Sequence, residues 1–93
     1  MSADSRRFSI EVSPHAERDL AKLPDTIARL ILEEILARLS TEPIQEMKTR
    51  IKRLTGFSPP LYRLRVGDYR VCYPVLLQHV VILGIFHKKD SDR

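Results

Sequence analysis

The sequence predicts an α+β fold in which one mostly antiparallel sheet carries a helical hairpin on one face. Three observations predict it: an alternating segment at Phe8–Val12, two helical patterns separated at Pro24-Asp25, and a β-rich second half with a Gly67-Asp68 turn. The expected order is β-α-α-β-β-β, because a sheet and two amphipathic helices bury their apolar faces against each other. We expect residues 1–93 to form a single domain, since a chain of this length sustains one modest core.

The first half of the chain contains a strand and two helices. Phe8–Val12 alternates apolar and polar residues, which predicts a half-buried strand. Ser13 and Pro14 then form a helix start, with serine as the N-cap and proline at the first helical position. A second helix is predicted from Thr26 to Leu39, with a broad apolar stripe that is typical of a core-facing helix.

The segments on either side of the central hairpin are less regular. His79–Phe86 is almost wholly apolar and does not alternate, so we expect a central strand that is covered on both faces. Leu76–Gln78 is expected to form the preceding turn. Ile44–Gly56 has no decisive pattern and is compatible with either a short helix or an extended loop.

The central hairpin is the most informative part of the sequence. With Gly67 and Asp68 as its two turn residues, the register of Leu61–Val66 against Tyr69–Val75 is determined, and Arg65 lies directly opposite Arg70. One face then holds Tyr62, Leu64, Val66, Tyr69, Val71 and Tyr73, which suits a core. The other face holds Arg63, Arg65, Arg70 and Cys72.

Two arginines that face each other across a strand pair destabilise it by about 0.2–1 kcal/mol. This cost is explained if an anion normally sits between Arg65 and Arg70, and the planar guanidinium suits a phosphate because it donates two parallel hydrogen bonds. The alternative interpretation is a hydrated face, or one neutralised by carboxylates from other elements.

Charge and cysteine content favour a polyanionic partner and a reducing compartment. Residues 1–46 contain six basic and nine acidic side chains, whereas residues 47–93 contain ten basic and three acidic ones. A basic half of this kind predicts contact with a nucleic acid or an acidic protein, although a solvated basic surface is also possible. Cys72 is the only cysteine, so an internal disulfide is excluded and a cytoplasmic location is expected. No apolar run approaches the roughly 20 residues of a membrane span, so no membrane association is expected.

Further candidate residues lie at the end of the last strand and before the hairpin. His87 stands beside Lys88 and Lys89, and the ordinary imidazole pKa of about 6.5 suits proton transfer, although lone histidines are more often structural. The basic residues of the ambiguous segment are candidates for RNA contacts: Lys48, Arg50, Lys52 and Arg53. One cysteine and three scattered histidines match no metal-ligand spacing, and no glycine-rich phosphate loop is present, so neither a metal nor a cofactor is expected.

The hairpin sequence resembles the centre of the RelE/ParE superfamily of toxins from type II toxin–antitoxin systems. The resemblance lies in Leu61–Val71, which reads Leu-Tyr-Arg-Leu-Arg-Val-Gly-Asp-Tyr-Arg-Val, and in the Leu-Thr-Gly approach at Arg53–Gly56. In the RelE branch it implies an enzyme that enters the ribosomal A site and cuts mRNA by attack of a 2′-hydroxyl on the adjacent phosphate. By position, Arg63, Arg65 and Arg70 match the family's basic hairpin residues, and Lys88 or Lys89 matches its basic residue after the last strand.

One departure from the family concerns the C-terminus. RelE nucleases typically carry a tyrosine just beyond that last basic residue, and this chain has none there. The resemblance makes His87 the natural substitute, because some relatives use a histidine near this point. Two other functions stay open: a ParE-like toxin that inhibits DNA gyrase without cutting RNA, and an inactive basic binding module. In each case the resemblance implies a cognate antitoxin as partner, besides the ribosome and mRNA for the nuclease.

Overall fold

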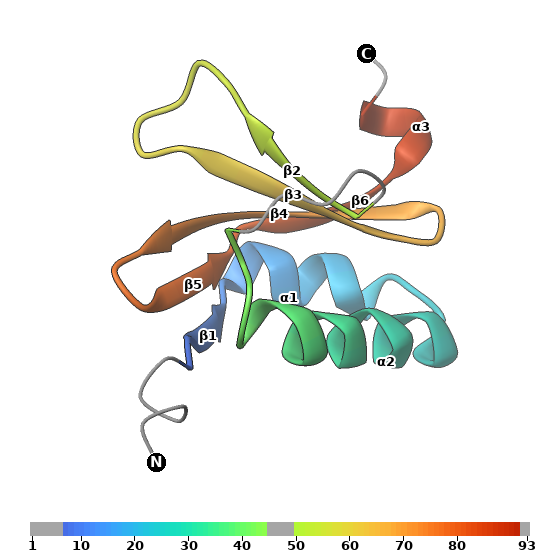
Figure 1. Ribbon diagram of the computed structural model, residues 1–93. Helices are drawn as coiled ribbons and strands as arrows, with labels where there is room; N and C mark the ends of the chain where they lie inside the picture. Colours follow the sequence, from blue (N-terminus) through green and yellow to red (C-terminus); the bar gives the residue numbers. More distant parts are fainter. Residues whose placement is uncertain (1–6, 45–49, 92–93) are drawn as a thin grey trace.

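The computed structural model describes residues 7–44 and 50–91 as six strands, three α-helices and one π-helical segment (Figure 1). In chain order they are β1 (Ser9–Val12), α1 (Pro14–Ala21), α2 (Asp25–Glu34), η2 (Ile35–Leu39), β2 (Ile51–Leu54), β3 (Leu61–Val66), β4 (Tyr69–Leu76), β5 (His79–Ile82), β6 (Gly84–His87) and α3 (Lys88–Ser91). None of the described helices is long and apolar enough to span a membrane.

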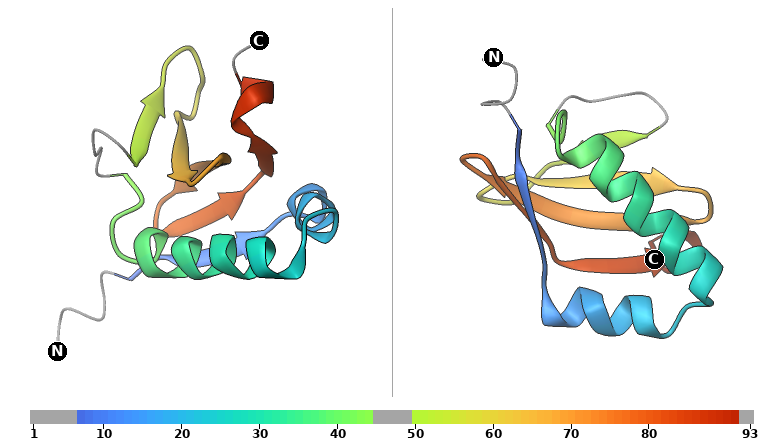
Figure 2. Two further views of the ribbon diagram at one scale, coloured as in Figure 1. Left: turned by 90° about the vertical axis from the view of Figure 1, so that its right-hand side faces the viewer. Right: turned by 90° about the horizontal axis from the view of Figure 1, so that it is seen from below.

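The strands form one sheet in the order β1-β5-β4-β3-β2, and β6 also pairs with β4. Only the β1–β5 pair is parallel among the described strands. Helices α1 and α2 both lie on one side of the sheet, with α2 running across it and α1 alongside the end that carries β6 (Figure 2). The predicted α+β class, with a mostly antiparallel sheet and a helical hairpin on one face, is therefore confirmed.

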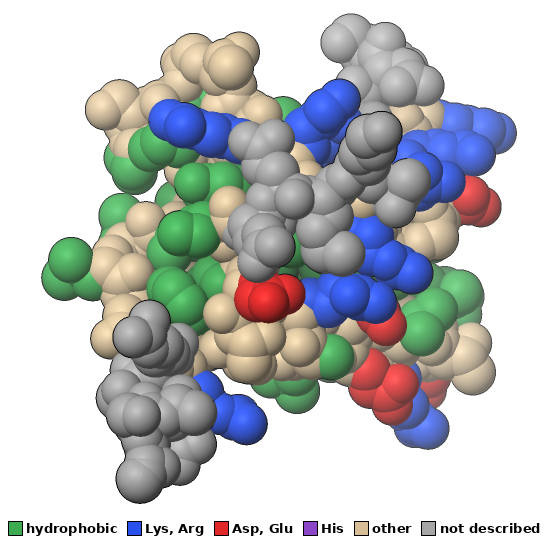
Figure 3. Space-filling model, in the orientation of Figure 1, with side chains coloured by type: hydrophobic (Ala, Val, Ile, Leu, Met, Phe, Trp, Pro, Cys, Tyr) green, Lys and Arg blue, Asp and Glu red, His purple; other side chains and the backbone are tan. Residues whose placement is uncertain are grey.

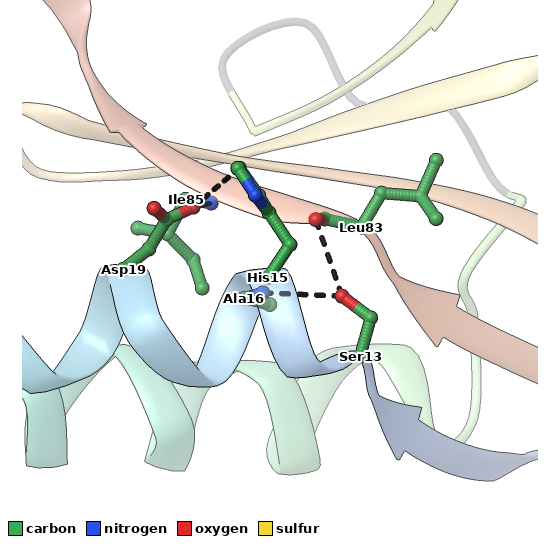
Figure 4. Close-up of polar contacts among 6 residues, drawn as sticks. All are labelled: Ser13, His15, Ala16, Asp19, Leu83 and Ile85. Carbon is green, nitrogen blue, oxygen red and sulfur yellow. Dashed lines mark hydrogen bonds and ion pairs between the residues drawn. The ribbon is translucent and has the colours of Figure 1, made fainter.

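The first helix begins where the sequence predicts. The Oγ of Ser13 accepts a hydrogen bond from the backbone N–H of Ala16 at 3.1 Å, and Pro14 is the first helical residue. The same hydroxyl donates to the carbonyl of Leu83 at 3.3 Å, which ties the start of α1 to the β5–β6 segment (Figure 4). At α2, in contrast, Pro24 precedes the helix without a side-chain cap, and Asp25 is its first residue.

The core lies between the helices and the facing side of the sheet. Its fully or nearly fully buried members are Ala16, Ile31, Ile35, Leu39, Ile51, Leu64, Val66, Val71, Tyr73, Val80, Ile82 and Ile85. The hydroxyl of Tyr73 donates to the carbonyl of Pro43 at 2.7 Å, and this buried bond connects β4 to the chain that follows η2. The apolar stripe of the second helix therefore supplies core residues, as its periodicity predicts.

The strand predicted at His79–Phe86 is wrong in two respects. The chain is divided at Leu83 into β5 and β6. β5 pairs with β4 through Val80 and Val75, and β6 pairs with β4 through Gly84 and Cys72, so the register of pairing shifts by one residue between them. The backbone N–H of Leu83 donates to the carbonyl of Cys72 at 2.9 Å, so the extra residue forms a bulge. Burial alternates along β5 instead of covering both faces, since α1 and α2 lie on one side of the sheet.

Two irregular segments are now assigned. Within Ile44–Gly56, residues 51–54 form the edge strand β2, and residues 45–49 lie outside the described part of the chain. The turn predicted at Leu76–Gln78 connects β4 to β5, and Leu77 adopts a φ of +59°, a conformation that costs most non-glycine residues about 1–2 kcal/mol.

Candidate functional site

The hairpin has the register that its turn residues predict. Val66 pairs with Tyr69, Arg65 with Arg70, and Arg63 with Cys72. Gly67 has a φ of +58° and Asp68 has a negative φ, which is the φ pattern of the predicted type II′ turn.

The basic side chains share the side of the sheet that faces away from α1 and α2. Pairing extends this side beyond the hairpin, because Lys52 of β2 lies opposite Arg63 and Phe86 of β6 lies opposite Arg70. We call this surface the arginine face; its members are Lys52, Arg63, Arg65, Arg70, Cys72 and Phe86. In Figure 3 the lysine and arginine side chains gather over the upper part of the molecule, whereas most carboxylates in view lie lower, over the helices.

Arg70 is held over the hairpin turn. Its Nη1 donates to the carbonyls of Gly67 at 3.1 Å and Tyr69 at 3.0 Å. Arg65 is exposed on the neighbouring strand, directly across the pair. The arrangement places two positive charges on directly opposed residues of adjacent strands, with the Arg70 guanidinium held in place, which suits one anion bound by both guanidinium groups.

Replacing Arg65 with threonine is expected to raise the free energy of unfolding by about 0.2–1 kcal/mol, because the cross-strand repulsion with Arg70 is lost and threonine suits a strand. Urea unfolding of the two chains measures the difference. Arg65→Lys keeps the charge and should give no such gain, and a destabilised Arg65→Thr chain would show that the pair is not repulsive.

Cys72 lies on the arginine face opposite Arg63 and is not activated. Burial raises the pKa of its thiol, and the nearby Arg63 guanidinium offsets only part of that effect. The thiol is therefore protonated near neutral pH, which is unsuitable for a nucleophile.

The structure does not bring His87 to the arginines. His87 pairs with Tyr69, and their rings meet edge-on with centroids 5.2 Å apart, so its side chain is on the helix side of the sheet. Its Nδ1 accepts a hydrogen bond from the backbone N–H of Lys89 at 3.1 Å. The residue opposite Arg70 is the neighbouring Phe86, so the proton-transfer role predicted for His87 has no support from its position.

Of the two lysines after β6, Lys88 lies at the hairpin turn. Lys88 donates its backbone N–H to the carbonyl of Asp68 at 2.7 Å, and its Nζ is 3.4 Å from the carboxylate of the same residue. Lys89 is exposed on α3. The start of α3 is thus fixed against the tip of the β3–β4 hairpin, so Lys88 lies close to the arginine face with its charge shared with Asp68.

The structure places the basic residues of the segment Ile44–Gly56 in different surroundings. Lys52 belongs to the arginine face, whereas Arg53 pairs with Tyr62 and so follows the opposite side of the sheet. Arg50 has its Nη1 at 3.8 Å from the Glu34 carboxylate, which also pairs with Arg38. Lys48 lies outside the described residues. Across residues 7–44 and 50–91, no group of three or more histidine, cysteine or acidic side chains is placed to hold a metal ion.

Comparison with known proteins identifies the family. Residues 10–91 match the family model described as the ParE toxin of the type II toxin–antitoxin system parDE. A relative named RelE1 from Methanocaldococcus jannaschii is 36% identical over 77 residues, which cover 83% of each chain. Toxin RelG of Mycobacterium tuberculosis is 33% identical over 88 residues, covering 92% of this chain and 97% of RelG.

The fold is shared with a solved complex of the same kind. The toxin–antitoxin complex RelBE2 of Mycobacterium tuberculosis contains a chain that superposes with a TM-score of 0.74 and 30% sequence identity, covering 87% of this chain and 91% of that one. The arginines of the β3–β4 hairpin, the α+β topology and these comparisons all indicate the same family. The chain belongs to the RelE/ParE toxin superfamily and is a RelE-like toxin of a type II toxin–antitoxin system.

Proposed function

We propose that the chain is a ribosome-dependent mRNA endonuclease. The 2′-oxygen of one nucleotide attacks the adjacent phosphorus as its proton passes to solvent water, which also supplies the proton for the leaving oxygen. The bond from phosphorus to the 5′-oxygen of the next nucleotide then breaks, and that oxygen takes up a proton. The products are a 2′,3′-cyclic phosphate and a 5′-hydroxyl, and no metal or cofactor takes part.

The observation that carries the proposal is the set of three arginines on the side of the sheet opposite α1 and α2, two of them directly opposed. The pentavalent transition state gathers negative charge on the non-bridging phosphate oxygens, and fixed cations at that position are a large catalytic contribution. Arg63, Arg65 and Arg70 supply these cations, and Lys52 and Lys88 border them. The face has no carboxylate among its described members, so a phosphate group meets no repulsion from it.

The described residues of this face are better suited to stabilising negative charge than to transferring protons. Arginine stays protonated near neutral pH and is a poor base, and His87 lies on the other side of the sheet. We therefore assign transition-state stabilisation to the arginines and no proton transfer to His87. A nuclease that relies on charge alone depends strongly on how its substrate is positioned, which agrees with a requirement for the ribosome.

The arginine face is also the surface that we expect an antitoxin to cover. The RelBE2 relative was solved as a complex with its antitoxin, and we propose that this chain is neutralised by a cognate antitoxin that covers the arginines. Toxin and target would then meet in the cytoplasm, where the ribosomes are.

The test is translation reconstituted with purified ribosomes and a defined mRNA, followed by mapping of the mRNA 5′ ends. Codon-phased cuts that require both the ribosome and the toxin support the proposal. The same preparation is added to a gyrase supercoiling assay, because the matching family model carries the ParE name. Inhibition of supercoiling without any mRNA cuts would assign the chain to the gyrase inhibitors instead.

Phe86 is expected to stack on an RNA base beside the arginines, because it is partly exposed, faces Arg70 and is outside the core. Loss of such stacking costs about 1–3 kcal/mol per base, so Phe86→Ala should weaken RNA binding accordingly. The sequence contains no tryptophan, so Phe86→Trp gives a single tryptophan whose fluorescence a 2′-O-methyl oligonucleotide should quench. Phe57→Trp, at an exposed loop position outside the face, is the control, and equal quenching in both chains would contradict the assignment.

A further inference from the structure

A second polar site lies on the other side of β6 from the arginines. A pocket of about 410 Å³ opens between α1, β6 and α3. Phe86 of the arginine face also borders this pocket, and six side chains with polar groups line it: His15, Asp19, Lys22, Tyr69, His87 and Asp90. Its volume falls in the range of about 300–1,000 Å³ that is usual for small-ligand sites. The proposed RNA cleavage uses none of these side chains, although the pocket adjoins the hairpin that carries Arg70.

The pocket has a rigid wall on the side of α1. The Oδ2 of Asp19 accepts a hydrogen bond from the backbone N–H of Ile85 at 2.9 Å and lies 3.5 Å from the Nε2 of His15 (Figure 4). A Cβ added at Gly84 would lie 3.3 Å from the same oxygen and 3.5 Å from the His15 ring, so glycine permits the close approach of helix and strand. The carboxylate is thus held in place by the β6 backbone.

The opposite wall is aromatic. The rings of Tyr69 and His87 meet edge-on at 5.2 Å, and both side chains reach the pocket. An aromatic wall beside fixed donors and acceptors is the usual construction of a site that stacks a nucleobase and binds its edge.

The charges of the pocket argue for a neutral ligand. Asp19 and Asp90 would repel a phosphate, and Lys22 would repel a cation, whereas a base offers donors and acceptors without net charge. Both described contacts of the Asp19 carboxylate use Oδ2, which leaves Oδ1 to accept from a ligand. Guanine is the base with two adjacent donors, N1–H and the 2-amino group, on its Watson–Crick edge, and its O6 accepts from a ring N–H of His15 or from Lys22.

We propose that this pocket binds a guanine base next to the cleaved phosphate and so sets the sequence preference of the toxin. The inference rests on the proposed function for its biological role. Tyr69 precedes Arg70 in the same strand, and their side chains alternate between the two sides of the sheet. Among the described strands β6 pairs with β4 alone, so its other edge carries no strand. An RNA whose phosphate lies between Arg65 and Arg70 would place a flanking base in the pocket around this edge.

The experiment is a titration of the full chain carrying Arg70→Ala with each of the four nucleosides, followed by the amide NMR signals of Gly84 and Ile85. Nucleosides lack phosphate, so the arginine face contributes little to their binding. Guanosine should shift these signals and bind at least about 5-fold more tightly than the other three, since a bidentate base contact discriminates by about 1–3 kcal/mol. His15→Ala and Asp19→Asn, added separately, should reduce this preference, and Arg18→Ala on the exposed side of the same helix should not.

Two outcomes overturn the inference. The first is that guanosine leaves the Gly84 and Ile85 signals in place, and the second is that it binds the His15→Ala and Arg18→Ala chains equally. Either result would count against the base pocket even if the wild-type chain cuts mRNA on the ribosome. Guanosine binding without any mRNA cuts would instead retain the pocket and reject the nuclease.

Discussion

Replacing Arg70 with alanine is expected to lower the rate of mRNA cleavage by about 100- to 1,000-fold while the chain stays folded. The magnitude is that of removing one fixed donor from the transition state of a transfer reaction. Arg70 is the best-positioned cation of the arginine face, because its guanidinium is already held by the carbonyls of Gly67 and Tyr69. A group held in this way needs little rearrangement when the phosphate becomes more negative.

The fold should tolerate this change because two effects oppose each other. The hydrogen bonds to Gly67 and Tyr69 are lost, but the hairpin tip is accessible, so water replaces them. The repulsion between Arg65 and Arg70 is removed at the same time. The melting temperature should therefore change by only a few degrees.

Four chains make the measurement decisive. Cleavage is followed by 5′-end mapping on programmed ribosomes for the wild type, Arg70→Lys and Arg70→Ala. Lysine keeps the charge but not the planar pair of donors, so its rate should fall between the other two. Arg29→Ala removes an exposed arginine from α2, on the opposite side of the sheet, and should cut as the wild type does. Equal rates for Arg70→Ala and Arg29→Ala would remove the arginine face from the mechanism.

The hairpin residues of the arginine face, Arg63, Arg65, Arg70 and Cys72, could be predicted from sequence because the hairpin is local. Once Gly67 and Asp68 are the turn, side-chain alternation determines which residues from Tyr62 to Tyr73 share a face, with no information from the rest of the chain. The helix start at Ser13 is local in the same sense, since the N-cap bond involves Ser13 and Ala16 only. Both features are confirmed.

The position of His87 could not be predicted in this way. The bulge at Leu83 depends on pairing with Cys72 in another strand, and it decides which residues of β6 lie opposite which residues of β4. A single apolar run such as His79–Phe86 contains no signal for that extra residue. The pocket beside α1 was missed for a similar reason, because Asp19 and Ile85 meet only through tertiary packing.

Replacing Tyr73 with phenylalanine is expected to lower the free energy of unfolding near neutral pH by about 1–3 kcal/mol. The Tyr73 side chain is fully buried, and its hydroxyl is the donor to the carbonyl of Pro43 at 2.7 Å. Without the hydroxyl that carbonyl loses its described partner inside the protein. The stacked contact with the Tyr62 ring, at a centroid distance of 5.8 Å, is kept in the variant, so the loss reports on the hydrogen bond. Urea unfolding at pH 7 gives the value.

The same pair of chains should behave differently at alkaline pH. Burial, followed by the neighbouring Tyr62 and Cys72, raises the pKa of Tyr73 far above its ordinary value of about 10. Above pH 10 the unfolded wild type therefore binds fewer protons than the folded one, and its stability falls with pH by up to about 1.4 kcal/mol per unit from this group. Tyr73→Phe has no such group, and the other ionisable residues are common to both chains.

The advantage of the wild type over Tyr73→Phe should therefore be constant from pH 7 to about pH 9 and shrink as the pH rises through 10 and beyond. Unfolding curves for both chains at each pH measure it as a difference, from which shared alkaline effects cancel. A difference that stays constant up to pH 11 would mean that Tyr73 ionises as easily in the folded chain as in the unfolded one. That result would contradict the buried hydrogen bond from the Tyr73 hydroxyl to the Pro43 carbonyl. It would also contradict the packing that holds the β3–β4 hairpin, and with it the arginines, against the helices.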